Sequence, residues 1–156
     1  MAGEKHPFKV THVLEQIDSY IKYGRIKVTK AIDVPITYHD PCQIGRNGGI
    51  FEQPRDIVKA ISTDFRDMTP NRQEQWCCGG GGGIVAIDSM NEMRLRSGAK
   101  KVEQIRATGA KIVASPCENC RLQMEGLNER HDLGVRIAAI MDLVVEAMEF
   151  PAKTGA

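Results

Sequence analysis

Five cysteines in an unusual order constrain this chain more than any other feature. They stand at positions 42, 77, 78, 117 and 120 of a 156-residue sequence. Their number is odd, and a disulfide between the neighbours Cys77 and Cys78 would be strained far from its preferred geometry. A disulfide framework also requires an even count and a secreted chain. The cysteines therefore predict metal or redox chemistry rather than structural bridges.

The charge and hydropathy of the chain exclude two classes of partner. Twenty-one basic residues against twenty acidic ones leave a net charge of +1, which disfavours nucleic acid as a partner. The most apolar stretch, 137–150, is interrupted by Asp142 and Glu146 and falls short of the roughly 20 apolar residues of a membrane span. Residues 1–9 contain no apolar signal core. We therefore expect a cytoplasmic protein without a direct membrane span.

Short β-branched segments alternate with amphipathic ones along the chain. Strands are predicted at 34–39, 111–115 and 135–140, and helices at 8–23, 54–65, 95–109, from 116 onward and at 141–149. This alternation implies parallel strands joined by crossover helices, which is an α/β fold. The length predicts a single domain over 1–156, with an ordered core at 8–150 and a disordered tail at 151–156.

The predicted order places the cysteines at one edge of the sheet. Cys42 and Cys117 each follow the carboxyl end of a predicted strand, which is where open parallel sheets bind ligands. Cys117 and Cys120 are three residues apart at a helix start, so their sulfurs face the same side and the helix N-terminus favours their thiolates. The glycine run 79–83 gives the backbone room to bend the adjacent cysteine pair toward the same centre.

Three kinds of site are compatible with these cysteines. A structural zinc site needs four thiolates and normally two C-x-x-C pairs, but only Cys117 and Cys120 have that spacing. An iron–sulfur cluster tolerates adjacent and scattered ligands, although the usual ferredoxin run of cysteines is missing. The spacing therefore favours an iron–sulfur centre over zinc, and zinc over a bare dithiol site.

The residues around the cysteines identify a family. These flanks are His39-Asp40-Pro41-Cys42, Gly45-Arg46, Pro54-Arg55, Cys77-Cys78-Gly79-Gly80 and Ser115-Pro116-Cys117 followed by Cys120. Over about residues 8–150, the chain resembles the cysteine-rich CCG domain of the heterodisulfide reductase catalytic subunit family. Within that family it looks most like the catalytic iron–sulfur subunit of membrane complexes associated with dissimilatory sulfur metabolism.

The resemblance implies a fold, a cofactor and a reaction. It implies a Rossmann-like parallel sheet and a noncubane [4Fe-4S] cluster with cofactor-binding residues at Cys42, Cys77, Cys78, Gly79, Gly80, Cys117 and Cys120. The cluster would reductively cleave a disulfide or trisulfide, or run the reverse thiol oxidation. The substrate would be a small heterodisulfide or a cysteine sulfide on a sulfur-carrier protein.

The same resemblance implies a partner. Family members usually carry an upstream ferredoxin-like region, whose cysteine runs are missing from this sequence. The chain would then be a fragment, a split subunit or a stand-alone module. It would receive electrons from an iron–sulfur subunit or a ferredoxin-like domain, in association with a membrane complex. The alternative is a noncatalytic assembly domain of a larger redox complex, stabilised by zinc or an iron–sulfur cluster.

Three flanking residues have both a functional and an ordinary interpretation. His39 could hydrogen-bond a cluster sulfur or relay a proton to the leaving thiolate, because the unperturbed pKa of histidine is near neutrality. A strand-end histidine that caps a turn is the favoured interpretation. Arg46 and Arg55 could steer an anionic substrate or tune the cluster potential, or they could be ordinary surface arginines.

Other residues near the glycine run are assigned to packing or to solvent. Trp76 is expected to pack over the site and shield it, and Met90 and Met93 are expected in the core. The segment 94–111 carries six basic side chains against Glu103. A solvated helix face is favoured there over a docking surface for an acidic partner.

Overall fold

A three-stranded parallel sheet forms the centre of the molecule. The computed structural model describes residues 7–150, and the predicted tail at 151–156 lies outside them. The strands are β1 (Ile36–Tyr38), β2 (Ile112–Ser115) and β3 (Arg136–Ala139), in the spatial order β1-β2-β3. Ile36 pairs with Ile112, and Val113 pairs with Ile137.

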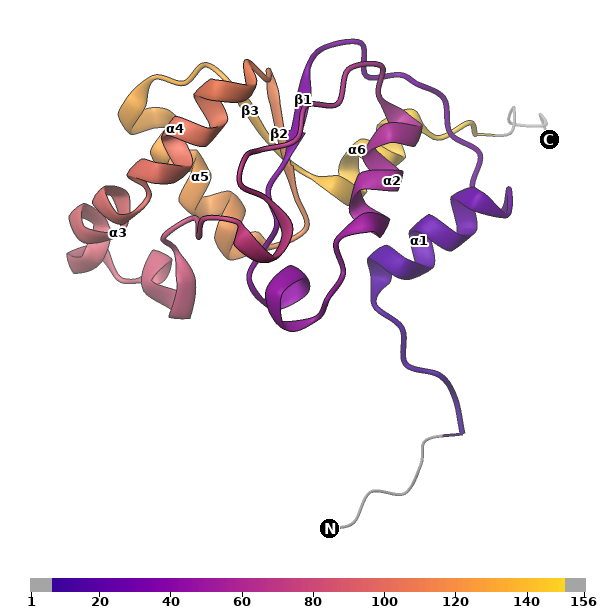
Figure 1. Ribbon diagram of the computed structural model, residues 1–156, viewed down its shortest axis with the longest axis horizontal. Helices are drawn as coiled ribbons and strands as arrows, with labels where there is room; N and C mark the ends of the chain where they lie inside the picture. The colour runs from indigo at the N-terminus through magenta and orange to yellow at the C-terminus, as the bar shows by residue number, and fades with distance from the viewer. Residues whose placement is uncertain (1–6, 151–156) are drawn as a thin grey trace, which may run out of the picture.

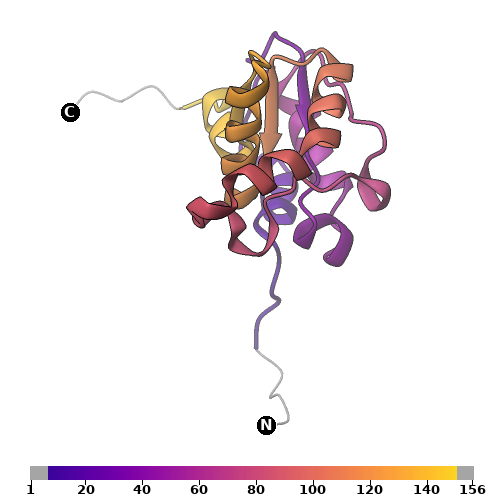
Figure 2. The same cartoon turned by 90° about the vertical axis from the view of Figure 1, so that its left-hand side faces the viewer.

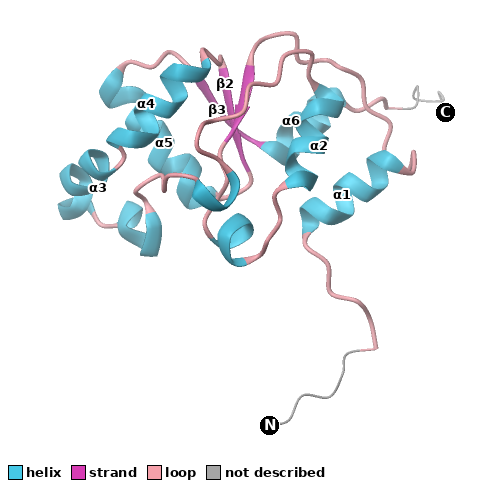
Figure 3. Ribbon diagram, viewed as in Figure 1, coloured by secondary structure: helices cyan, strands magenta, loops and turns pink. Residues whose placement is uncertain are grey.

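Two groups of helices enclose the sheet (Figure 1). The helices are α1 (Val13–Lys22), α2 (Glu52–Ile61), α3 (Asn91–Ser97), α4 (Ala99–Thr108), α5 (Glu118–His131) and α6 (Ile140–Ala147). Figure 3 shows α1, α2 and α6 on one side of the strands and α3, α4 and α5 on the other. Figure 2 shows the second group from its outer side, with the strands behind it. The predicted α/β class is confirmed.

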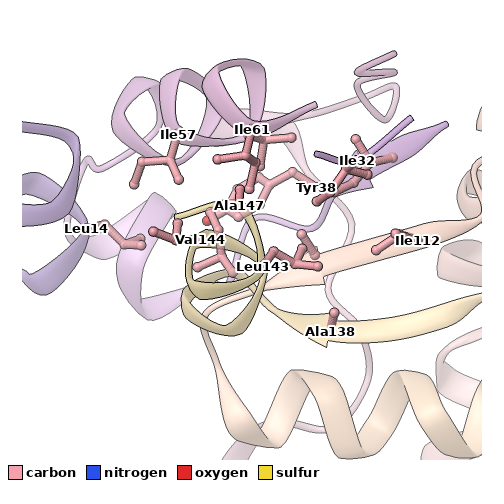
Figure 4. Close-up of a cluster of buried hydrophobic side chains, with 14 residues drawn as sticks. Leu14, Ile32, Tyr38, Ile57, Ile61, Ile112, Ala138, Leu143, Val144 and Ala147 are labelled. Carbon is pink, nitrogen blue, oxygen red and sulfur yellow. The ribbon is translucent and has the colours of Figure 1, made fainter. Parts of the chain in front are cut away.

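Each face of the sheet packs on its own buried cluster, because successive strand residues point to opposite faces. On one face, Leu14 of α1, Ile57 of α2 and Leu143 of α6 pack with Ile112 (Figure 4). On the other face, Val113 packs with a second cluster that contains Met68, Ile105, Met124, Cys78 and Cys120. Burial on both faces is typical of parallel sheets. The second cluster therefore joins the hydrophobic core to the cysteines.

Helix α1 is shorter than the predicted segment 8–23 because a capping box starts it late. The backbone N–H of Leu14 donates to His12 Nδ1 at 3.2 Å, and the N–H of His12 donates to Glu15 Oε2 at 2.9 Å. These two bonds satisfy donors that the first helical turn leaves free. Residues 8–12 therefore precede the helix.

The predicted helix 95–109 is broken at Gly98 into α3 and α4. A Cβ atom at Gly98 would lie 2.6 Å from Leu127 Cδ1, so the break allows close packing against α5. Helix α4 ends at Gly109 in the left-handed conformation, as predicted. Helix α2 ends at Ile61 because 62–65 leaves the helix to make bridges beside β1.

No helix within residues 7–150 has both the length and the apolar character needed to cross a membrane.

Candidate metal centre

All five cysteines line one cavity of about 150 Å³ at the carboxyl edge of the sheet. Cys42 follows β1 and directly precedes a π-helical turn, Gln43–Asn47. Cys117 follows β2 and caps α5, whose first turn contains Cys120. The remaining wall is formed by Pro41, Gln43, Ile44, Cys77, Cys78, Gly80, Gly81, Gly82 and Asn119. The fold thus gathers three distant cysteine segments into one site.

The sulfurs are free thiols and lie close together. Cys78 and Cys120 are buried, and their Sγ atoms are 3.4 Å apart in a thiol hydrogen bond. Cys42 Sγ accepts a bond from Gln75 Nε2 at 3.4 Å, and Cys77 Sγ accepts one from the backbone N–H of Gly79 at 3.4 Å. Cys78 and Cys120 therefore face each other without a disulfide, and the other three cysteines line the same cavity.

This crowding disfavours negative charge on the sulfurs when no cation is bound. The bond to Cys120, followed by burial, raises the pKa of Cys78 to about 12. Its bond to Cys78 and burial also raise the pKa of Cys77. Both groups are thiols at neutral pH, so a metal must displace their protons to bind.

His39 lies against the buried sulfurs. Its ring is fully buried, and one ring nitrogen and the Sγ atoms of Cys78 and Cys120 all lie within 4.8 Å of one another. Neither ring nitrogen has a hydrogen-bond partner in the described part of the chain. Burial, with help from the charge of Lys101, lowers the pKa of His39 well below 6.5. The ring is therefore a neutral imidazole, and it does not cap a turn, contrary to the favoured prediction.

These observations show that the residues present fit a sulfur-bound metal or cluster. Buried polar groups are rarely left without a partner, and the exceptions often mark a missing ion or ligand. Here an unpartnered imidazole stands beside a set of free thiols. A larger hollow of about 450 Å³, between 24–27 and 148–150, contains neither cysteine nor histidine.

The glycine run holds the cysteine pair against helices on either side. Gly79 has a φ of +91°, and a Cβ atom there would lie 2.5 Å from Ser97 Oγ. A Cβ atom at Gly80 would lie 2.7 Å from the Cβ of Gln123 on α5. Gln123 Nε2 in turn donates to the carbonyl of Cys78 at 3.0 Å. Gly80 lines the cavity, whereas Gly79 is not among the residues of its wall.

Arg55 is fully buried, so it is not a surface arginine. Its guanidinium makes two bonds of 2.8 Å to Asp40 and bonds of 2.7 and 3.0 Å to Asp67. A further bond of 2.8 Å to the carbonyl of Phe51 uses its fifth donor. Burial opposes its charge, but the bonds to the two carboxylates raise its pKa. Because Asp40 is two residues before Cys42, this network fixes the loop that presents that sulfur.

Arg46 is exposed, and its side chain connects two cysteine segments. Its Nε donates to the carbonyl of Gln73 at 3.2 Å, and a terminal nitrogen donates to the carbonyl of Gln75 at 2.8 Å. The segment after Cys42 is thereby tied to the segment before Cys77.

Three packing predictions are wrong. Trp76 is 49% exposed and lines a separate hollow with Thr69 and Lys100, so it does not shield the cysteines. Met90 and Met93 are exposed, because α3 approaches α5 through Arg94 and Leu95 instead.

Lys101 is a site residue that sequence reasoning missed. It belongs to the basic segment interpreted as a solvated face, yet only 1% of it is exposed. Its Nζ donates to Gln104 Oε1 at 2.5 Å and approaches Met68 Sδ at 3.6 Å. The sequence does contain a signal for the burial of Lys101. This lysine is three residues after Gly98 and four before Ile105, on the inward side of the helix.

Comparison with known proteins supplies the family context. The model of the CCG family, described as a cysteine-rich domain, matches residues 36–125. One subunit of a dihydromethanophenazine:CoB–CoM heterodisulfide reductase from Methanosarcina mazei is 33% identical over 154 residues, or 98% of this chain and 37% of that protein. An iron–sulfur subunit of an Hdr-like menaquinol oxidoreductase from Archaeoglobus fulgidus is 28% identical over 149 residues, 90% of this chain and 27% of that protein.

A third relative bears a different name. A probable membrane-anchored ferredoxin from Chromohalobacter salexigens is 30% identical over 148 residues, covering 90% of this chain and 22% of that protein. The chain therefore spans little more than a third, at most, of the length of these relatives.

Proposed function

This chain belongs to the CCG family of cysteine-rich domains, and we propose that it is the iron–sulfur module of a heterodisulfide reductase-like thiol–disulfide oxidoreductase. One observation carries the proposal: five free cysteines from three segments line a single cavity. Five sulfurs exceed the four ligands of a closed zinc site. Residues 1–156 would form a single cysteine-rich iron–sulfur domain.

The cofactor would be a noncubane [4Fe-4S] cluster. Its ligands would be Cys42, Cys77, Cys78, Cys117 and Cys120, with Gly80 in the wall beside them. When bound, the cluster would supply electrons one at a time and a metal site for sulfur. Gly79 would serve the site indirectly, by allowing the close approach of the cysteine pair to α3.

The chain's own residues would position groups and move a proton. The neutral imidazole of His39 has one N–H donor and one acceptor nitrogen, so it can donate to a sulfur or deliver a proton to a leaving thiolate. The bonds from Arg55 to Asp40 would hold the Cys42 loop in place. Pro41 and Ile44 would exclude water from one wall of the cavity.

The reaction would be the cleavage of a disulfide or trisulfide, or its reverse. Cleavage of a disulfide breaks the S–S bond with two electrons and two protons and releases two thiols. The electrons would come from an iron–sulfur subunit or ferredoxin-like domain, as part of a membrane-associated complex. The substrate would be a small heterodisulfide or a cysteine sulfide on a carrier protein. The names of the relatives, which include reductase subunits and a ferredoxin, support this choice.

A second candidate is a noncatalytic metal-stabilised assembly domain. The observation that favours it is the compact group of His39, Cys78 and Cys120, all buried, because nitrogen and sulfur ligands in a closed setting suit structural zinc.

Anaerobic loading with iron and sulfide, compared with zinc, separates the two candidates. We expect stoichiometric iron and acid-labile sulfide, and an EPR signal that changes when a thiol substrate is added. Absence of stoichiometric iron and sulfide would contradict the proposed function. A cluster whose spectrum ignores thiols and disulfides, or colourless zinc protein of higher stability, would support the assembly role.

A further inference from the structure

Lys101 is a buried cation without an anionic partner. Its ammonium group reaches only an amide oxygen, Gln104 Oε1, and a thioether, Met68 Sδ. Within residues 7–150, no carboxylate oxygen lies within 4.0 Å of its Nζ. Both of its partners are neutral groups. The lysine is therefore hydrogen-bonded, but its charge is not balanced by an ion pair.

The other cations of the molecule show how unusual this is. Lys100, the preceding residue, is exposed and pairs with Glu103 at 2.9 Å. Arg55, which is also fully buried, pairs with two carboxylates. A buried charge is costly unless an opposite charge compensates it. The chain follows this rule at Arg55 and departs from it at Lys101.

The cysteine site can supply an opposite charge. Met68, whose sulfur approaches Nζ, packs in the same buried cluster as Cys78 and Cys120. The charge of Lys101 is attracted by the carboxylate of Asp40, and it would be attracted by Cys78, Cys77 and Cys120 once they are thiolates. Asp40 is already engaged by two bonds from Arg55. The three cysteines remain, and they become anions when they bind a metal.

In the metal-free protein, the positive charge of Lys101 is buried without a compensating negative charge. Burial lowers the pKa of Lys101 to about 8, against the opposing attraction of Asp40. The lysine thus fits the loaded site better than the metal-free one.

We propose that Lys101 is the counter-charge of the cysteine site: its ammonium group balances the thiolates of the bound centre and raises that centre's reduction potential. The inference rests on the proposed function and adds a residue to it. A nearby positive charge favours the addition of an electron, and net charge is one of the factors that set iron–sulfur potentials. Lys101 acts through the bound centre and is a positioning and tuning residue.

The test compares Lys101→Met with Lys100→Met. Methionine keeps an unbranched side chain of similar length and removes the charge. Lys100 is the neighbouring residue on the same helix and is exposed, so Lys100→Met is the matched control. The proteins are loaded with iron and sulfide, and their potentials are measured by EPR during redox titration. We expect Lys101→Met to lower the equilibrium constant for one-electron reduction about tenfold, or about 59 mV, and Lys100→Met to leave it unchanged.

A second measurement detects a purely structural role. Thermal unfolding of the metal-free proteins should occur at an unchanged or higher temperature in Lys101→Met, because a buried unpaired charge has been removed. Zinc binding to the same proteins should weaken about tenfold, because the thiolates lose their counter-charge. If Lys101 served only through its bonds to Gln104 and Met68, the metal-free variant would unfold earlier and the potential would not move.

The outcomes separate this inference from the proposed function. If the loaded wild-type protein and loaded Lys101→Met have the same reduction potential, the proposed role of Lys101 is overturned, and the proposed function is not affected. If wild-type protein takes up zinc but no iron–sulfur cluster, the proposed function fails, and the zinc affinities still decide the role of the lysine. If the wild-type protein takes up neither zinc nor an iron–sulfur cluster, the proposed function and the role of Lys101 are both overturned.

Discussion

The two faces of the sheet bury different chemistry. The face covered by α1, α2 and α6 packs aliphatic side chains such as Leu14, Ile57 and Leu143. The opposite face packs methionines and valine against Cys78 and Cys120, and close to it lie the unpartnered ring of His39 and the unbalanced charge of Lys101. The buried cluster of the first face contains no cysteine. The second has groups that a bound metal centre would satisfy, so its stability and chemistry should depend on loading.

Replacing a cysteine should have the largest effect on the difference between the two faces. We expect Cys78→Ser to abolish the cluster signal after anaerobic loading while the metal-free protein still folds, as measured by EPR and circular dichroism. Leu143→Ala is the opposite case. It should cost about 2–5 kcal/mol of unfolding free energy in the metal-free protein through its cavity, yet leave iron uptake per folded molecule unchanged. Normal cluster signals in Cys78→Ser would contradict the assignment of that ligand.

The buried arginine network gives the next largest effect. Arg55→Met removes the guanidinium that Asp40 and Asp67 share, and we expect a loss of about 3–5 kcal/mol of unfolding free energy in urea titrations. Arg66→Met is the control, because the pair of Arg66 with Asp64 is exposed, and it should change stability little. Equal losses in the two variants would show that the Arg55 network does not support the Cys42 loop.

Two glycines of the same run should respond differently. Alanine at Gly80 meets Gln123 of α5, so we expect Gly80→Ala to cost about 1–3 kcal/mol and to slow cluster uptake. Nothing lies within 4 Å of a Cβ atom at Gly81, so Gly81→Ala should be tolerated. Chemical denaturation and iron analysis of both variants measure the difference. Equal tolerance would mean that the close approach at Gly80 is not required.

The smallest effect concerns pH. Because burial keeps the pKa of His39 well below 6.5, the unfolded chain binds a proton near pH 6.5 that the folded chain does not. Stability of the metal-free protein should therefore fall as pH decreases from about 7 to 5.5, by at most about 1.4 kcal/mol per pH unit. His39→Gln should flatten this slope in urea titrations at several pH values. An unchanged slope in the variant would assign the pH dependence to other groups.

Alternation along the chain was enough to predict the layout of the site. Strand-like segments separated by helical ones imply parallel strands, and the positions of Cys42 and Cys117 after two of those strands imply a shared edge. The cavity at that edge contains both sulfurs. Short-range patterns succeed here because the succession of strands and helices along the chain and the spacing of the cysteines are local properties of the sequence.

The contact partners and the solvent exposure of individual side chains could not be predicted in the same way. Local patterns were sufficient for the α/β class and for the approach of five cysteines to one edge. The folded structure was needed to learn that Arg55 is buried, that Met90 and Met93 are exposed, and which groups surround Lys101. The physical reason is that the burial of a charge depends on groups distant in sequence, such as Asp67 for Arg55 and the sulfurs for Lys101, and periodicity along one helix does not encode them.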